Sequence, residues 1–223
     1  MALLKAEELY YHYRTKAQTV RAVDGVSLEL ERGGFYALIG RSGSGKSTLL
    51  SLLAGLETPM GGRITVNGEE LKKDALTLYR RNTASVIFQS FNLFPLMTVK
   101  ENCMYPLLLQ KRPKKEAEHT ACDMLEKVGL GAGYFKRLPA QLSGGEQQRA
   151  AIARTLAAGT ELVFADEPTG NLDSKNSEQI VALLRAVSRD EGRCVLVVTH
   201  DTRIAEGADA VFKMDSGRLE ESV

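Results

Sequence analysis

The eight residues from Gly40 to Ser47 combine glycine, hydroxyl and lysine side chains in the order G-x-x-x-x-G-K-S. Glycines allow the backbone to fold closely around phosphate oxygens, so that successive N–H groups point at them from the start of a helix. Lys46 adds a positive charge for the β- and γ-phosphates of a nucleotide, and the Ser47 hydroxyl is a ligand for Mg²⁺. The sequence therefore predicts a phosphate-binding loop here.

Two adjacent carboxylates, Asp166 and Glu167, follow the apolar run Leu162–Ala165. The run predicts a buried strand, and ligands of open α/β sheets bind beyond the carboxyl ends of the strands. Two acids after a strand can also begin an ordinary loop, but their place behind a phosphate-binding loop favours chemistry. We expect Asp166 to orient Mg²⁺ and Glu167 to polarise the water that attacks a phosphate.

A second helix start with phosphate-binding character lies further along the chain. Ser143 and Glu146 have the S-x-x-E spacing of a capping box. Gly144 and Gly145 lower helix propensity in the first turn, so helix stability does not explain them, whereas bare N–H groups at a helix start bind anions. Two such sites in one chain favour two chains arranged head to tail, each completing the nucleotide site of the other.

These residues need a scaffold, and the hydrophobic pattern predicts one. Leu3–Tyr10 and Val26–Leu30 alternate apolar and polar residues, which indicates antiparallel strands, and Arg63–Val66 enters a hairpin at Asn67-Gly68. Five continuous apolar runs predict buried strands of a mainly parallel sheet: Phe35–Ile39, Ser85–Phe88, Leu162–Ala165, Cys194–Val198 and Val211–Met214. Helical spacing follows from Thr48 to Gly55, from Lys115 to Gly129 and from Ser174 to Gly192.

Alternation of strands and helices predicts the α/β class, in one domain spanning residues 1–223. The stretch 91–158 has helix patterns but no buried strand, so we expect a helical subdomain inserted between 1–90 and 159–223. Its first part carries apolar residues suited either to the core of the insert or to contact with a partner: Phe91, Leu93, Phe94, Met97 and Tyr105. Its basic cluster, 111–115, fits a solvated loop or contact with lipid headgroups.

Composition narrows the classes of function. Of 223 residues, 43% are hydrophobic and 26% charged, which excludes a disordered chain. The 29 basic and 28 acidic residues give a net charge of +1, so no nucleic-acid partner is expected. No apolar run approaches the ~20 residues that cross a bilayer, and the charged first ten residues are not typical of a signal peptide. We expect any role at a membrane to depend on a partner.

With these segments in this order, the whole sequence resembles the ATP-binding subunits of ABC transporters. Gly40–Ser47 is similar to the Walker A loop of that family, Leu162–Asp166 to Walker B, and Leu142–Gly145 to the signature sequence. By the same resemblance, Gln89 matches the glutamine that links the metal site to the membrane partner, and His200 the switch histidine. Asn171-Leu172-Asp173 resembles the loop that follows Walker B.

The resemblance implies a P-loop NTPase fold with a mainly parallel central sheet, an antiparallel β subdomain and an inserted helical subdomain. It implies ATP and Mg²⁺ as cofactors, with Ser47, Gln89 and Asp166 at the metal and Glu167, His200 and Gln89 in catalysis. Tyr13 matches the aromatic residue that stacks on adenine, with Tyr10 and Tyr11 as alternatives. The other nucleotide-binding residues implied are Gly40, Ser42, Gly43, Ser44, Gly45, Lys46, Ser47, Thr48, Ser143, Gly144, Gly145 and Asp173.

The implied partners are a second copy of the chain and an integral membrane permease, which places the protein in the cytoplasm at the inner face of the cell membrane. Asn171 stands where many members have alanine, and Glu146 where many have glutamine. The segment Pro168–Ser174 resembles the branch of lipoprotein-releasing, macrolide-exporting and peptide-antibiotic-resistance ATPases, so we expect an exporter or extractor of lipids, lipoproteins, peptides or drugs. A nucleotide-gated signalling module of the cell-division type and an importer ATPase remain alternatives.

Overall fold

The computed structural model describes residues 2–14 and 18–220. One sheet of the described chain is antiparallel and has the strand order β2-β1-β4-β5. Its strands are β1 (Ala2–Arg14), β2 (Thr19–Glu31), β4 (Gly61–Val66) and β5 (Glu69–Glu70). The predicted hairpin is confirmed, since Asn67 and Gly68 both have positive φ, 54° and 83°, between β4 and β5.

The other sheet has the order β10-β9-β3-β8-β7-β6 and is parallel except for its antiparallel edge strand β10. Its strands are β3 (Phe35–Gly40), β6 (Ala84–Ile87), β7 (Leu162–Asp166), β8 (Cys194–Val198), β9 (Ala210–Asp215) and β10 (Arg218–Glu220). All five predicted runs form strands, which confirms the mainly parallel sheet. The expectation that both faces of β9 are buried is wrong, because β9 lies next to the edge and only Met214 is buried.

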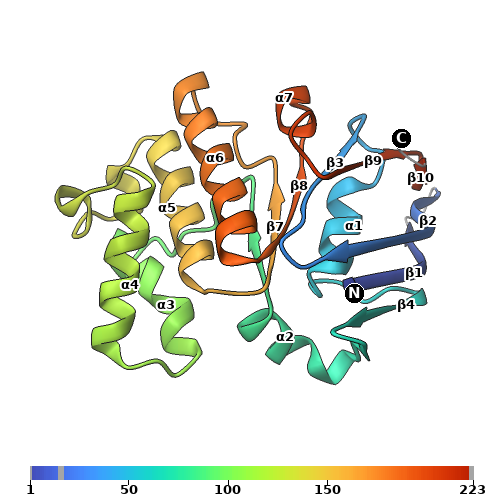
Figure 1. Ribbon diagram of the computed structural model, residues 1–223, viewed down its shortest axis with the longest axis horizontal. Helices are drawn as coiled ribbons and strands as arrows, with labels where there is room; N and C mark the ends of the chain where they lie inside the picture. The colour runs from blue at the N-terminus through green and yellow to red at the C-terminus, as the bar shows by residue number, and fades with distance from the viewer. Residues whose placement is uncertain (1, 15–17, 221–223) are drawn as a thin grey trace.

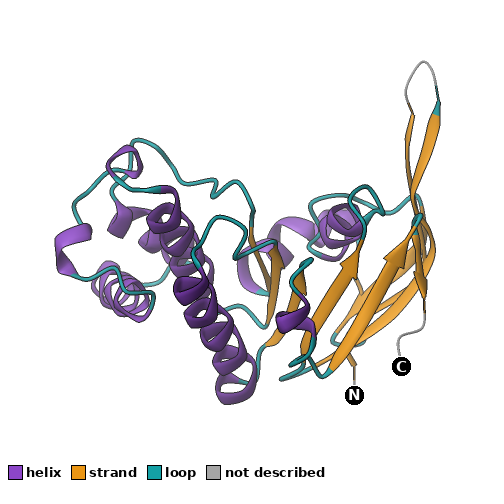
Figure 2. Ribbon diagram, turned by 90° about the horizontal axis from the view of Figure 1, so that it is seen from above, coloured by secondary structure: helices purple, strands orange, loops and turns teal. Residues whose placement is uncertain are grey.

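The helices of the described residues are α1 (Lys46–Leu53), α2 (Leu76–Asn82), α3 (Val99–Leu109), α4 (Lys114–Lys127), α5 (Gly144–Ala157), α6 (Ser174–Glu191) and α7 (Thr202–Ala205). Three short 3-10 helices join them, at Lys73–Ala75, Ala132–Tyr134 and Pro139–Gln141. Figures 1 and 2 show α3, α4 and α5 gathered at one side of the molecule and the antiparallel strands at the other. None of the described helices has both the length and the apolar character needed to span a bilayer.

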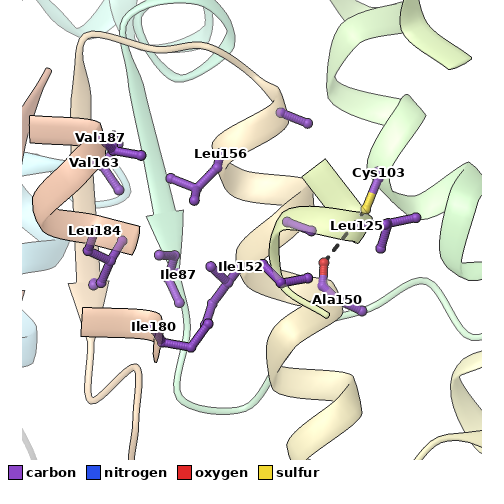
Figure 3. Close-up of a cluster of buried hydrophobic side chains, with 14 of the residues drawn as sticks. Ile87, Cys103, Leu125, Ala150, Ile152, Leu156, Val163, Ile180, Leu184 and Val187 are labelled. Carbon is purple, nitrogen blue, oxygen red and sulfur yellow. Dashed lines mark hydrogen bonds between the residues drawn. The ribbon is translucent and has the colours of Figure 1, made fainter. Parts of the chain in front are cut away.

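Alternate residues of the parallel strands build two cores, one on each face of the sheet. On one face, Leu38, Phe164 and Leu196 pack with α1 and the antiparallel sheet, so that α1 lies between the two sheets (Figure 1). On the other face, the core is shared by the strands, α6 and the helices of the 91–158 stretch. Figure 3 shows Ile152 of α5 directed toward Ile87 of β6 and Ile180 of α6. The helices between β6 and β7 thus share a core with the sheet.

Helix α3 was not individually expected from the sequence. Pro106 lies inside it, and the apolar residues at its C-terminal end, Leu107, Leu108 and Leu109, surround the axis rather than follow one face. A capping signal was nevertheless present, because Thr98 accepts the amide of Glu101 while the Glu101 carboxylate accepts the amide of Thr98.

Candidate functional site

The strand order β3-β8-β7-β6 brings four predicted site segments together at the carboxyl edge of the parallel sheet. The phosphate-binding loop follows β3, His200 follows β8, Asp166 and Glu167 lie at the end of β7, and Gln89 follows β6. Between them lies a cavity of about 550 Å³, within the usual size of a ligand site. Twelve of the site residues predicted from the sequence line this cavity: Tyr13, Gly40, Ser42, Gly43, Gly45, Lys46, Ser47, Thr48, Gln89, Asp166, Glu167 and His200.

The loop after β3 has the backbone geometry of an anion cradle. Gly45 has φ 106°, and a side chain there would meet the carbonyl oxygen of Ala22. Gly43 has φ 77° and lines the cavity, and a Cβ atom there would have no heavy atom within 4 Å apart from those of Gly43 and its chain neighbours. Helix α1 begins directly after Gly45 without a side-chain cap, so its first amides are free to meet an anion.

Lys46 directs its charge into this loop. Its Nζ donates to the carbonyl oxygens of Gly40 and Arg41, at 2.9 and 2.8 Å. Ser44 is the one loop residue of the predicted set that is buried, and it does not line the cavity. The loop therefore presents backbone, hydroxyl and ammonium groups to the cavity, which are the groups that phosphate oxygens accept from.

The donor set beside the loop fits a magnesium ion. Ser47 Oγ donates to Asp166 Oδ1 at 3.3 Å, and Gln89 lines the same cavity. Burial raises the pKa of Asp166, and the charge of Glu167 adds to this, while the hydrogen bond from Ser47 opposes it. A partly desolvated carboxylate gains from a nearby cation. The hydroxyl, carboxylate and amide oxygens of Ser47, Asp166 and Gln89 suit Mg²⁺, which proteins commonly bind through one or two carboxylates together with substrate phosphates.

Glu167 and His200 form a pair across the ends of β7 and β8. His200 Nδ1 lies 2.9 Å from Glu167 Oε1. Glu167 has φ 47°, an uncommon conformation for a residue other than glycine, and its amide donates to Val198 O at 2.9 Å. The strained backbone and the imidazole together hold the carboxylate at the cavity.

The Glu167 contact gives a prediction for pH titration. The hydrogen bond to Glu167, and then its charge, raise the pKa of the exposed His200 imidazole. A raised pKa means that the contact stabilises the fold below the unfolded-state pKa of histidine and that this stabilisation disappears as pH rises through the folded-state value. In an NMR titration, we expect His200 to titrate at lower pH in Glu167→Gln than in the unmodified protein. An unchanged titration of His200 in Glu167→Gln would contradict the pairing.

The antiparallel sheet supplies the outer wall of the cavity. Of the three alternatives for the aromatic residue, Tyr13 lines the cavity, whereas Tyr10 and Tyr11 do not. Tyr13 is 47% exposed and its hydroxyl lies 3.3 Å from Thr48 Oγ1. Val20 and Ala22 of β2 also line the cavity and were missed by the sequence analysis. Only the pairing of Tyr13 with Val20 across β1 and β2 brings them there, and no linear pattern signals it.

The other predicted residues, Ser143, Gly144, Gly145 and Asp173, do not line this cavity. The capping box at α5 is confirmed, since Ser143 Oγ accepts the amide of Glu146 at 3.3 Å and Glu146 Oε2 accepts the amide of Ser143 at 2.7 Å. The amide of Ser143 thereby lowers the pKa of Glu146. Asp173 caps α6 by accepting the amide of Asn176 at 2.9 Å.

Contacts that the sequence analysis did not predict connect these exposed helix starts to the cavity. Buried Gln148 of α5 donates to Pro168 O at 3.0 Å, just after Glu167. Arg149 donates to Asn176 Oδ1 at 2.5 Å, and Asn171 Nδ2 donates to Gln89 O at 3.3 Å. The start of α5 and the segment after β7 are therefore held to each other.

Comparisons with known proteins agree with this geometry. Residues 23–170 match the family described as ABC transporter. The lipoprotein-releasing system ATP-binding protein LolD of Legionella pneumophila is 41% identical over 97% of this chain and 96% of its own length. The macrolide export ATP-binding/permease protein MacB of Brucella melitensis is 39% identical over 97% of this chain, which spans 34% of that longer protein. The dimeric ATP-binding cassette MJ0796, bound to ADP and Pi after hydrolysis, matches with a TM-score of 0.93 and 35% identity over 98% of this chain and 97% of that one.

Proposed function

The chain belongs to the ABC transporter family, whose ATP-binding domain is an ATPase, and we propose that it forms a head-to-tail homodimer around two Mg·ATP and powers a separate membrane permease. We further propose that the permease exports or extracts lipids, lipoproteins, peptides or drugs. The names of LolD and MacB support this choice of cargo class. Through the permease, the protein is placed at the inner face of the cell membrane.

The proposed dimer rests on one observation. The cavity gathers the phosphate-binding loop, Asp166, Glu167 and His200, but the second predicted anion site at Ser143 lies outside it, exposed at the start of α5. A helix start aimed at a phosphate from a second chain accounts for a glycine pair that weakens its own helix. The related cassette MJ0796 is dimeric, which supports the participation of a second chain.

Each residue of the cavity has a proposed task. The loop amides and Lys46 bind the phosphates, and Ser47, Asp166 and Gln89 would hold Mg²⁺, which offsets phosphate charge when bound. Glu167 accepts a proton from the attacking water, and His200 keeps the carboxylate in place through the 2.9 Å contact. Tyr13 stacks on the adenine ring. In this proposal residues 1–90 and 159–223 form the nucleotide-binding core, and 91–158 the helical subdomain.

A second cavity, of about 470 Å³, fits the permease contact. It lies between the end of α1, α2, β6 and the helices α3 and α5, and its lining includes the exposed side chains of Leu56, Phe94 and Leu109. Of the apolar residues left open by the sequence, Phe94 and Tyr105 line it, whereas Leu93 packs on the core. We propose that a short apolar helix of the permease binds in this groove.

Leu109→Ser tests the groove. The side chain is 48% exposed, so we expect the melting temperature to fall by only about 2 °C. Loss of a groove contact should weaken capture of the permease by about tenfold or more in a pull-down with a tagged chain. Met60→Ser is the control, because Met60 is 56% exposed and lies outside the groove. Equal capture by both variants, or a large loss of stability in Leu109→Ser, would contradict the assignment.

Transport is tested by co-reconstitution in vesicles. The captured permease and this chain are placed in vesicles with the ATPase domain outside, and a labelled lipopeptide or drug is followed during ATP hydrolysis. Nucleotide-dependent movement out of the ATP-facing leaflet or compartment is the expected result. ATP-dependent assembly without movement of any cargo would favour the signalling alternative, and movement in the opposite direction would favour the importer.

A further inference from the structure

The segment that follows Gln89 has a strained backbone. Phe91 and Asn92 are consecutive residues with φ 58° and 50°, in the left-handed region that residues other than glycine rarely occupy. Such conformations persist only where the surrounding structure holds them. Gln89 lines the nucleotide cavity and Asn92 lines the apolar groove. The strained pair therefore lies between the two sites.

Arg154 of α5 holds this segment. Its Nη1 donates to Asn92 O at 2.5 Å and its Nη2 to Phe91 O at 2.9 Å, so one planar guanidinium binds both strained residues. The same guanidinium lies 5.8 Å from the ring centre of Phe94. The ion pairs formed within residues 2–14 and 18–220 do not include Arg154, and burial lowers the pKa of Arg154. The charge is thus directed at the two carbonyl groups.

The ends of the segment are held separately. The hydroxyl of Thr155, the next residue of α5, lies 3.1 Å from Val86 O of β6 and 3.0 Å from Ala151 O, and it shares its proton between these two carbonyl groups. Asn171 donates to Gln89 O at 3.3 Å from the loop after β7. Between these anchors, the Arg154 fork is the side-chain contact that holds the carbonyls of Phe91 and Asn92 in their strained conformation.

We propose that Arg154 is a positioning residue for Gln89: it locks residues 91 and 92 in the left-handed conformation and so keeps Gln89 at the nucleotide cavity. The proposal rests on the proposed role of Gln89 at the metal site. With this role for Arg154, helix α5 has two tasks. Its N-cap, Ser143, meets the site of a second chain in the proposed dimer, and Arg154, near the other end of the helix, holds the segment after Gln89.

Hydrogen exchange of the nucleotide-free protein tests the lock directly. In Arg154→Met, we expect amides of residues 89–94 to exchange about tenfold faster or more, because the strained segment opens locally, while amides of β7 stay protected. Arg193→Met is the matched control, since Arg193 also donates to a carbonyl of α5, Leu156 O at 3.0 Å, but does not contact this segment. Unchanged exchange at 89–94 in Arg154→Met overturns the proposal.

Arg154→Lys covers the case in which the methionine variant does not fold. A single ammonium keeps the charge but cannot reproduce the planar fork, so we expect a smaller increase in exchange confined to the same amides. Protection equal to that of the unmodified protein would show that charge alone suffices and would remove the fork from the proposal.

A double-mutant cycle in kcat then asks whether Arg154 acts through Gln89. If it does, Arg154→Lys together with Gln89→Ala should be no slower than Gln89→Ala alone, because the positioned side chain is already absent. Losses that multiply would overturn the positioning role. If Gln89→Ala by itself leaves kcat unchanged, the proposed role of Gln89 fails, and the exchange experiment still decides whether Arg154 holds the segment.

Discussion

Glu167→Gln should reduce ATP turnover by about 10²- to 10⁴-fold while ATP still binds. The amide keeps the size of the side chain and an oxygen that can accept from His200, but it cannot take a proton from water. In the proposed function, nucleotide binding rests on the phosphate-binding loop and Tyr13, which the substitution does not change. With hydrolysis blocked, the ATP-bound dimer should accumulate.

Steady-state hydrolysis and size-exclusion chromatography with Mg·ATP measure the two effects. Glu161→Gln is the matched control, because Glu161 directly precedes β7, at the opposite end of the strand from Glu167, and pairs with Arg32 on the surface at 3.3 Å. We expect the control to hydrolyse ATP at the normal rate and to form no long-lived dimer. Turnover near normal in Glu167→Gln would remove Glu167 from the catalytic role.

Ser143→Arg should abolish the ATP-induced dimer and nearly all hydrolysis, while the monomer binds ATP normally. A bulky cation at the start of α5 obstructs the contact with the phosphate held by a second chain, and the chain's own cavity does not include this residue. Thr98→Arg is the control, since Thr98 caps α3 with the same kind of box. Both changes lose a cap worth about 1 kcal/mol, but only Ser143→Arg should lose activity.

Mixing Ser143→Arg with Lys46→Ala makes the experiment sharper. Lys46→Ala weakens nucleotide binding in its own cavity, because it deletes the charge in the phosphate-binding loop. In the mixed dimer, one composite site carries both lesions and the other carries neither, so partial activity should return. A mixture that forms heterodimers but stays as inactive as either variant alone would exclude independent sites shared between two chains.

The features that the sequence predicted well are those with short-range causes. The order of glycine, hydroxyl and lysine residues determines the phosphate-binding loop, continuous apolar runs determine the parallel strands, and the capping box determines where α5 begins. Each depends on residues within a few positions of one another. The helix α3 was missed because Pro106 and apolar residues around the helix axis remove the periodic signal.

Tertiary structure alone decided how these segments meet. The strand order β3-β8-β7-β6 puts Lys46, His200, Glu167 and Gln89 at one cavity, and it depends on pairing between strands far apart in the chain. Packing of the antiparallel sheet against the site brings Tyr13 to the cavity and not Tyr10 or Tyr11, and Ser143 lies outside the cavity. No sequence pattern singles out Arg154, because the two carbonyl groups that its guanidinium binds lie more than 60 residues away in the chain. Local sequence determines which groups are available for chemistry, whereas long-range packing determines which of them share a site.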